Sequence, residues 1–166
     1  MIERSDLMFR IGFGYDVHSL AEGAPLILGG VEIPWQRGLT SHSDGDVVLH
    51  ALMDALLGAA CLGDIGVHFP DTDPKYKGCS SLLLLSKVGE MIRGAGYRVN
   101  NVDCTLAAQQ PKVMHYIPGM REGIARVLGV AADQVNIKAT TTEHLGFTGR
   151  EEGMECFAVC TIASLP

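Results

Sequence analysis

Residues 46–62, DVVLHALMDALLGAACL, form an apolar run that is interrupted at regular intervals. The interruptions are Asp46, His50, Asp54 and Gly58, each four residues after the one before. Because residues four apart stack on one face of an α-helix, the pattern predicts a helix with a narrow polar stripe. A helix that is apolar on its other faces is mostly buried, and buried charges need partners. A metal ion or a bound substrate is the natural candidate for that partner.

Helix capping and pairing with neighbouring groups would explain the same polar residues without a metal or substrate site. Ser43 or Asp44 can cap the helix, and Asp46 in its first turn would suit the helix dipole. Asp54 can pair with a neighbouring group, and His50 can be a satisfied histidine of the core. The stripe alone therefore leaves both interpretations open.

Elsewhere the chain alternates between strand and helix patterns. Alternating apolar and polar positions indicate strands, Gly29-Gly30 indicates a hairpin, and apolar positions at helical spacing indicate helices. The expected elements are a strand at 9–18, a hairpin at 25–34, a loop at 37–45, the helix at 46–62, a turn-rich flap at 63–78, a helix at 80–94, a strand at 97–109, a helix at 117–129, and strands at 135–142 and 154–165. This order predicts an α+β fold, a two-layer sandwich in which a mixed sheet carries helices on one face.

Composition narrows the class of protein. A chain of 166 residues favours a single domain, 1–166, with a short leader at 1–8. Hydrophobic residues make up 47% and charged residues only 19%, so we expect part of the apolar surface to lie between subunits. A net charge of -6 without a basic run argues against nucleic acid. No segment has the pattern of a signal peptide or a membrane span.

The cysteines indicate the compartment. There are five, an odd number, and none forms a CxxC pair: Cys61, Cys79, Cys104, Cys156 and Cys160. Free thiols in a reducing compartment are the ordinary explanation, which predicts a cytoplasmic protein.

Candidate chemistry begins with Asp16 and His18 on the first strand. Residues two apart on a strand point to the same face. Together with His50 they would supply three ligands and leave the fourth position of a tetrahedral metal open. A D-x-H pair also arises by chance, and His42, in the loop before the helix, is either a ligand contact or a solvated side chain.

Two later segments carry polar groups suited to phosphate and hard cations. The flap at 63–78 is rich in aspartate, and it is either a mobile arm over a ligand or a set of ordinary turns. Residues 140–153, TTTEHLGFTGREEG, place hydroxyls before Glu143, which suits phosphate and a cation such as Mg²⁺. A threonine-rich strand with a solvated tail is the alternative, as a solvated surface lysine is for Lys112, which otherwise can reach a phosphate.

Taken together, five motifs resemble one family. These are GYDVH, HSDGDVVLHALMDALLGAACLGDIG, FPDTDP, NVDCTLAAQQPK and KATTTEHLGFTGREEG. Their order and spacing from Phe9 onward are similar to those of the 2-C-methyl-D-erythritol 2,4-cyclodiphosphate synthases of non-mevalonate isoprenoid biosynthesis. The resemblance implies a homotrimer with active sites between subunits. It implies a phosphorus–oxygen lyase that cyclises 4-diphosphocytidyl-2-C-methyl-D-erythritol 2-phosphate and releases CMP.

The resemblance also implies metals and site residues. Asp16, His18 and His50 match ligands of Zn²⁺, and Glu143 matches a ligand of a second cation, Mg²⁺ or Mn²⁺. The positions that match catalytic residues are His42, Thr141 and Glu143. The positions that match substrate contacts are Asp16, His18, His42, Ser43, Asp64, Gly66, Phe69, Asp71, Ala108, Lys112, Val113, Met114, Ala139, Thr140, Thr141, Phe147 and Arg150.

Within that set the resemblance implies distinct subsites. His42 and Ser43 match contacts to the methylerythritol phosphate, and Asp64 and Gly66 match contacts to ribose and the neighbouring sugar. The Phe69 and Asp71 flap closes beside them. The cytosine loop spans 108–114, and 139–141 match contacts to the nucleotide phosphates.

Two details extend the resemblance beyond the motif matches. Phe147, Arg150 and Glu152 match positions near the trimer axis, where an isoprenoid diphosphate can bind, although here Glu151 adds an acid beside Arg150. We also assign Asp46 a role in orienting the zinc site, as a hypothesis.

Two other functions remain as alternatives. A non-catalytic zinc or nucleotide-binding module would bind ligand without releasing CMP. A zinc hydrolase would give an open-chain phosphate, although no general base is evident beside the three ligands.

Overall fold

A five-stranded mixed sheet forms one layer of the molecule. The computed structural model describes residues 8–165, so most of the expected leader lies outside it. The strand order is β4 (Arg37–Leu39), β1 (Phe9–Glu22), β7 (Gly153–Ser164), β5 (Tyr97–Ala107) and β6 (Val135–Thr140). Neighbouring strands are antiparallel except for the parallel pair β5 and β6. A separate hairpin joins β2 (Leu26–Leu28) to β3 (Val31–Ile33), as the Gly29-Gly30 pair predicts.

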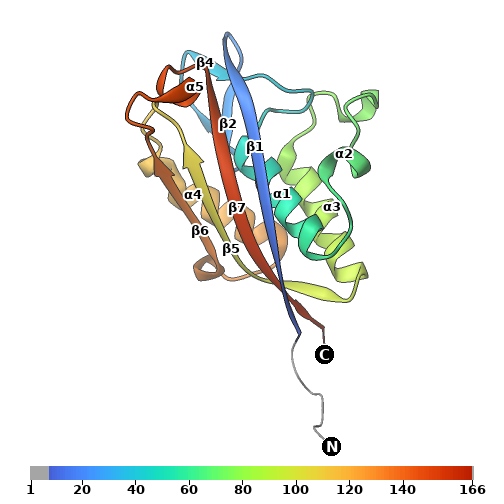
Figure 1. Ribbon diagram of the computed structural model, residues 1–166. Coiled ribbons are helices and arrows are strands. Elements are labelled where there is room, and N and C mark those ends of the chain that lie inside the picture. Colours follow the sequence, from blue (N-terminus) through green and yellow to red (C-terminus); the bar gives the residue numbers. More distant parts are fainter. Residues whose placement is uncertain (1–7, 166) are drawn as a thin grey trace, which may run out of the picture.

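Three long helices form the second layer (Figure 1). They are α1 (Val47–Ala59), α3 (Ser81–Gly94) and α4 (Ile117–Leu128), and they pack on the same face of the sheet. The predicted two-layer α+β sandwich is therefore confirmed. Among the described residues, none of the helices combines the length and the apolar character that crossing a bilayer requires.

The structure corrects several predicted boundaries. The first strand continues to Glu22, because its end pairs with β4, a strand that lies within the expected loop 37–45. The flap contains two short helices, α2 (Ile65–His68) and η1 (Pro74–Tyr76), capped by the side chains of Asp64 and Asp73. Further short helices are η2 (Met114–Tyr116), η3 (Ala132–Gln134) and α5 (Gly146–Gly149).

Asp46 caps α1, which corrects the expectation that Ser43 or Asp44 does so. Its carboxylate accepts hydrogen bonds from the backbone N–H groups of Val48 and Leu49 in the helix, and from those of Gly29 and Gly30 in the hairpin. Burial raises the pKa of this carboxyl to about 6, although the four backbone donors favour its charged form. Asp46 thus ties the β2–β3 hairpin to the start of α1.

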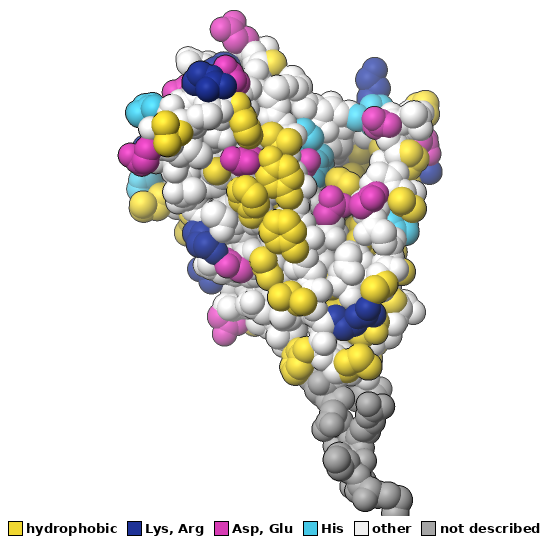
Figure 2. Space-filling model, in the orientation of Figure 1, with side chains coloured by type: hydrophobic (Ala, Val, Ile, Leu, Met, Phe, Trp, Pro, Cys, Tyr) yellow, Lys and Arg dark blue, Asp and Glu magenta, His cyan; other side chains and the backbone are white. Residues whose placement is uncertain are grey.

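The face of the sheet that the helices do not cover is largely apolar. Figure 2 shows a yellow band down this face. The side chains of Ile11 and Phe13 are 72% and 63% exposed, and the other exposed apolar residues of β1 and β7 are Phe9, Tyr15, Val17, Phe157 and Val159. A contiguous apolar surface of this kind is typical of a protein interface.

Candidate active site

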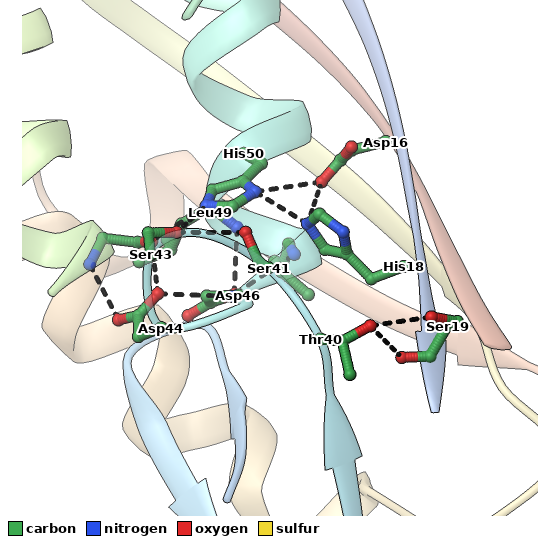
Figure 3. A network of polar contacts seen from close by, with 12 residues as sticks. Asp16, His18, Ser19, Thr40, Ser41, Ser43, Asp44, Asp46, Leu49 and His50 are labelled. Carbon is green, nitrogen blue, oxygen red and sulfur yellow. Dashed lines mark hydrogen bonds and ion pairs between the residues drawn. The ribbon is translucent and has the colours of Figure 1, made fainter. Parts of the chain in front are cut away.

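Three side chains from two elements converge between β1 and the start of α1 (Figure 3). Asp16 and His18 lie on the helix-facing side of β1, and His50 lies in the first turn of α1. His18 Nε2 is 2.9 Å from His50 Nδ1 and 2.9 Å from Asp16 Oδ2, and His50 Nδ1 is 3.1 Å from Asp16 Oδ2. We call this group the triad. The residues of the D-x-H pair and the histidine of the helical stripe thus lie together in the structure.

The triad fits a zinc ion. Two imidazole nitrogens and a carboxylate oxygen are donors that zinc prefers, and tetrahedral ligands at zinc distances lie about 3.3 Å apart. The triangle of 2.9 to 3.1 Å needs only a small expansion to reach that spacing. Among the described residues, it is the group whose acidic and imidazole atoms cluster closely enough to hold a metal.

The charges of the triad support one another. Burial opposes ionisation of Asp16, but hydrogen bonds from His18 and His50 outweigh it and lower its pKa to about 2. Burial likewise opposes a charged His50, but the hydrogen bond and the negative charge of Asp16 keep the pKa of His50 above its ordinary value. The Asp16 carboxylate of the triad is therefore ionised near neutral pH, and its negative charge can neutralise part of the charge of a bound cation.

We expect this pairing to appear in acid unfolding of metal-free protein. The folded pKa of Asp16 lies below the ordinary value of 3.8, so its stabilisation is present above pH 4 and is lost as the pH falls toward 2. The difference in the free energy of unfolding between wild type and Asp16→Asn should therefore shrink by about 2 kcal/mol from pH 5 to pH 2. Urea titrations with a chelator present measure it, and a difference that stays constant would contradict the assignment.

A cavity of about 320 Å³ opens beside the triad. It brings together the triad and several residues that the sequence assigned to substrate: His42, Ser43, Gly66, Phe69 and Asp71. Asp64 is not among the lining residues, and its carboxylate accepts from the backbone N–H of Val67 at the start of α2. The sequence did not single out Met53, Tyr76 and Leu84, which also line this cavity, because their apolar character signals only the core.

A second cavity, of about 460 Å³, collects the predicted nucleotide residues. Its lining includes Ala108, Lys112, Val113, Met114, Ala139, Thr140 and Thr141. The ends of the parallel strands β5 and β6 bring the two segments side by side, since Ala107 pairs with Thr140. The two cavities have no lining residue in common.

Glu143 lines neither of these cavities. It is exposed, its backbone φ is 52°, and its carboxylate accepts a hydrogen bond of 2.7 Å from Thr141 Oγ1. A positive φ is costly for a residue other than glycine and often marks a functional position. Glu143 therefore contacts the second cavity through Thr141, which is one of the residues that line it.

The residues assigned to a trimer axis lie around α5. Phe147 is within this helix, and Arg150 ends it and pairs with Glu152. Glu151 pairs with Arg37 of β4 instead, so the extra acid does not compete for Arg150.

Comparison with known proteins shows which family has this site. The model of the YgbB family matches residues 9–163. The chain belongs to the YgbB family. It is 58% identical to the 2-C-methyl-D-erythritol 2,4-cyclodiphosphate synthase of Clostridium perfringens over 153 residues, 92% of this chain and 98% of that protein. The enzyme of the same name from Syntrophobacter fumaroxidans is 58% identical over 155 residues, 93% of this chain and 98% of that one.

Solved structures agree with this membership of the YgbB family. The bifunctional IspDF of Campylobacter jejuni superposes with a TM-score of 0.93 at 43% identity, covering 96% of this chain and 43% of that chain. A complex of Plasmodium falciparum IspF with CDP superposes with a TM-score of 0.84 at 34% identity, covering 98% and 100%. The predicted identification as a cyclodiphosphate synthase, a lyase, is confirmed.

Proposed function

We propose that two cavities together cyclise 4-diphosphocytidyl-2-C-methyl-D-erythritol 2-phosphate. One is the cavity beside the triad, called the triad cavity below, and the other is the second cavity of a neighbouring subunit. The 2-phosphate oxygen attacks the β-phosphorus of the diphosphate, the bond from that phosphorus to CMP breaks, and 2-C-methyl-D-erythritol 2,4-cyclodiphosphate and CMP are released. The observation that carries this proposal is the triad in the lining of a cavity, in a chain 58% identical to such synthases.

The chain's own residues position the reactants. His42 and Ser43 would hold the 2-phosphate end within the triad cavity, which Phe69 and Asp71 border. Residues of the loop 108–114 and of 139–141 would hold cytosine and its phosphates in the second cavity. The attack is intramolecular, so holding both phosphates in one orientation raises the effective concentration of the 2-phosphate oxygen at the β-phosphorus.

Two cations are part of this proposal. Asp16, His18 and His50 would hold Zn²⁺, and Glu143, oriented by Thr141, would hold Mg²⁺ or Mn²⁺. When bound, these ions neutralise phosphate charge and act as Lewis acids. Such local charge is how a protein of net charge -6 binds a polyanion.

A homotrimer would place the two cavities together. The separate linings of the cavities support this arrangement, as does the uncovered apolar face of β1 and β7. We expect Phe13→Asp to convert the trimer to monomer, because the substitution puts a charge at the centre of that face. Sedimentation should give three times the 17.8 kDa chain mass for wild type and one chain mass for the variant. Wild type at one chain mass would refute the trimer.

Two further assignments complete the proposal. We place an isoprenoid diphosphate at the trimer axis, near Phe147 and Arg150, on the motif match alone. We place the protein in the cytoplasm because all five cysteines are free. We expect no nucleic-acid partner because the net charge is -6, and no membrane partner because the sequence has no apolar run long enough to span a bilayer.

Phosphorus NMR with the diphosphocytidyl substrate, Zn²⁺ and Mg²⁺ tests the function. A cyclic diphosphate together with CMP supports the proposal. An open-chain phosphate would favour the zinc hydrolase, and intact substrate with folded, zinc-loaded protein would favour the binding module.

A further inference from the structure

The ring nitrogen of His50 that faces away from the triad is held by a chain of hydrogen bonds (Figure 3). His50 Nε2 lies 3.1 Å from Ser81 Oγ and 3.0 Å from Ser43 Oγ. Ser81 in turn donates to Asp44 twice, from its hydroxyl to Oδ1 at 2.5 Å and from its backbone N–H to Oδ2 at 2.8 Å. Ser81, the first residue of α3, is fully buried, so its contact with His50 is shielded from water, whereas Ser43 and Asp44 are partly exposed.

The direction of this chain follows from the chemistry of its members. A carboxylate only accepts hydrogen bonds, so the single hydroxyl hydrogen of Ser81 points to Asp44. Ser81 Oγ must then accept from His50, which requires a hydrogen on Nε2. With the hydrogen of Nε2 engaged by Ser81, the nitrogen left for a metal is Nδ1, which faces Asp16 and His18, and an ion bound there would replace the hydrogen that Nδ1 shares with Asp16 in the metal-free site.

We propose that Asp44 and Ser81 are positioning residues that set the tautomer of His50 so that Nδ1 is available to the metal. The inference rests on the zinc site of the proposed function. It differs from the hypothesis that Asp46 orients this site: the Asp46 carboxylate bonds to backbone N–H groups of the hairpin and of the helix, whereas Ser81 bonds to His50 itself. Partners of this kind on the outer nitrogen raise the affinity of histidine for metal.

The same arrangement leaves the hydroxyl of Ser43 able to donate a hydrogen bond to a ligand. Because Nε2 carries a hydrogen, Ser43 Oγ can only accept from it, and the hydroxyl hydrogen of Ser43 is left to donate elsewhere. Ser43 lines the triad cavity, so an anionic phosphate oxygen bound there is a suitable acceptor.

Zinc affinity, measured by competition with a chromophoric chelator, tests the inference. In Asp44→Asn the new amide would keep its oxygen on the backbone N–H of Ser81 and turn its NH₂ toward Ser81 Oγ. The hydroxyl of Ser81 would then reverse toward His50 and favour hydrogen on Nδ1. We therefore expect Asp44→Asn to weaken zinc binding about 10- to 100-fold, and Ser81→Ala, which leaves Ser43 as a partner, by less than about 10-fold.

The double variant separates this mechanism from general damage. If Asp44→Asn acts by reversing Ser81, removing that hydroxyl should restore the zinc affinity of Asp44→Asn/Ser81→Ala to that of Ser81→Ala alone. Additive losses would overturn the inference, as would affinities within about twofold of wild type. Ser86→Ala on the same helix and the exposed Asp133→Asn are matched controls that should bind zinc as wild type does.

Nitrogen NMR of histidine-labelled, metal-free protein gives a readout that does not need zinc. We expect a His50 Nε2–H signal that is protected from exchange in wild type and loses that protection in Ser81→Ala. A wild type that shows this signal but binds no zinc would refute the metal site and leave the hydrogen-bond chain in place. A wild type that binds zinc without the signal would refute the chain alone.

Discussion

Replacing His50 with alanine is expected to lower kcat/KM for cyclic diphosphate formation by about 10³-fold or more. The variant removes one of three ligands and leaves Asp16 and His18 without the partner that lies 2.9 Å from His18 Nε2. Two ligands from one strand hold a metal weakly, so the protein should also be purified with little zinc. Release of CMP and zinc content per chain are the two measurements.

His68→Ala is the matched control for zinc content. His68 Nε2 bonds to the backbone oxygen of Leu62 and lies outside the triad, so this variant should keep its zinc. A His50→Ala protein with a full complement of zinc and normal CMP release would remove the triad from the mechanism.

Gly14→Ala is expected to cost about 3 to 5 kcal/mol of the free energy of unfolding, or to prevent folding altogether. A Cβ at position 14 would lie 2.0 Å from the backbone oxygen of Ala51, and one at Gly12 would lie 1.8 Å from that of Ala55. These atoms belong to the helix backbone and cannot rotate away, so α1 would have to move off β1. Urea unfolding measures the loss.

The same displacement connects the fold to the site. Ala51 follows His50 in α1, so a helix that moves away from β1 also withdraws His50 from Asp16 and His18. Any folded Gly14→Ala protein should therefore bind zinc more weakly than wild type. Gly58→Ala on the same helix is the control, because nothing lies within 4 Å of its new Cβ. It should be neutral or stabilising by up to about 1 kcal/mol. Equal stability of the two variants would contradict the close packing.

Helix and strand periodicity in the sequence predicted much of the fold and of the candidate metal site. The stripe of Asp46, His50 and Asp54 predicted α1, and the D-x-H pair on a strand predicted two ligands on one face. These signals survive in the structure because strand and helix periodicity are properties of neighbouring residues. The stripe does not act as one unit, however, since Asp54 accepts from the backbone N–H of Ile65 rather than joining the triad.

The chain by itself determined the family and the alternation of strands and helices, and it predicted which residue types carry the chemistry. Only the tertiary structure decided that Asp46 serves the hairpin, that β4 pairs with the end of β1, and that Ser81 and Asp44, 37 residues apart, support His50. It also decided that the triad and the residues predicted to bind the nucleotide line separate cavities of the one chain. The physical reason is the distance along the sequence. Periodicity reflects contacts between residues a few positions apart, whereas hydrogen bonds between elements depend on how the helices pack on the sheet.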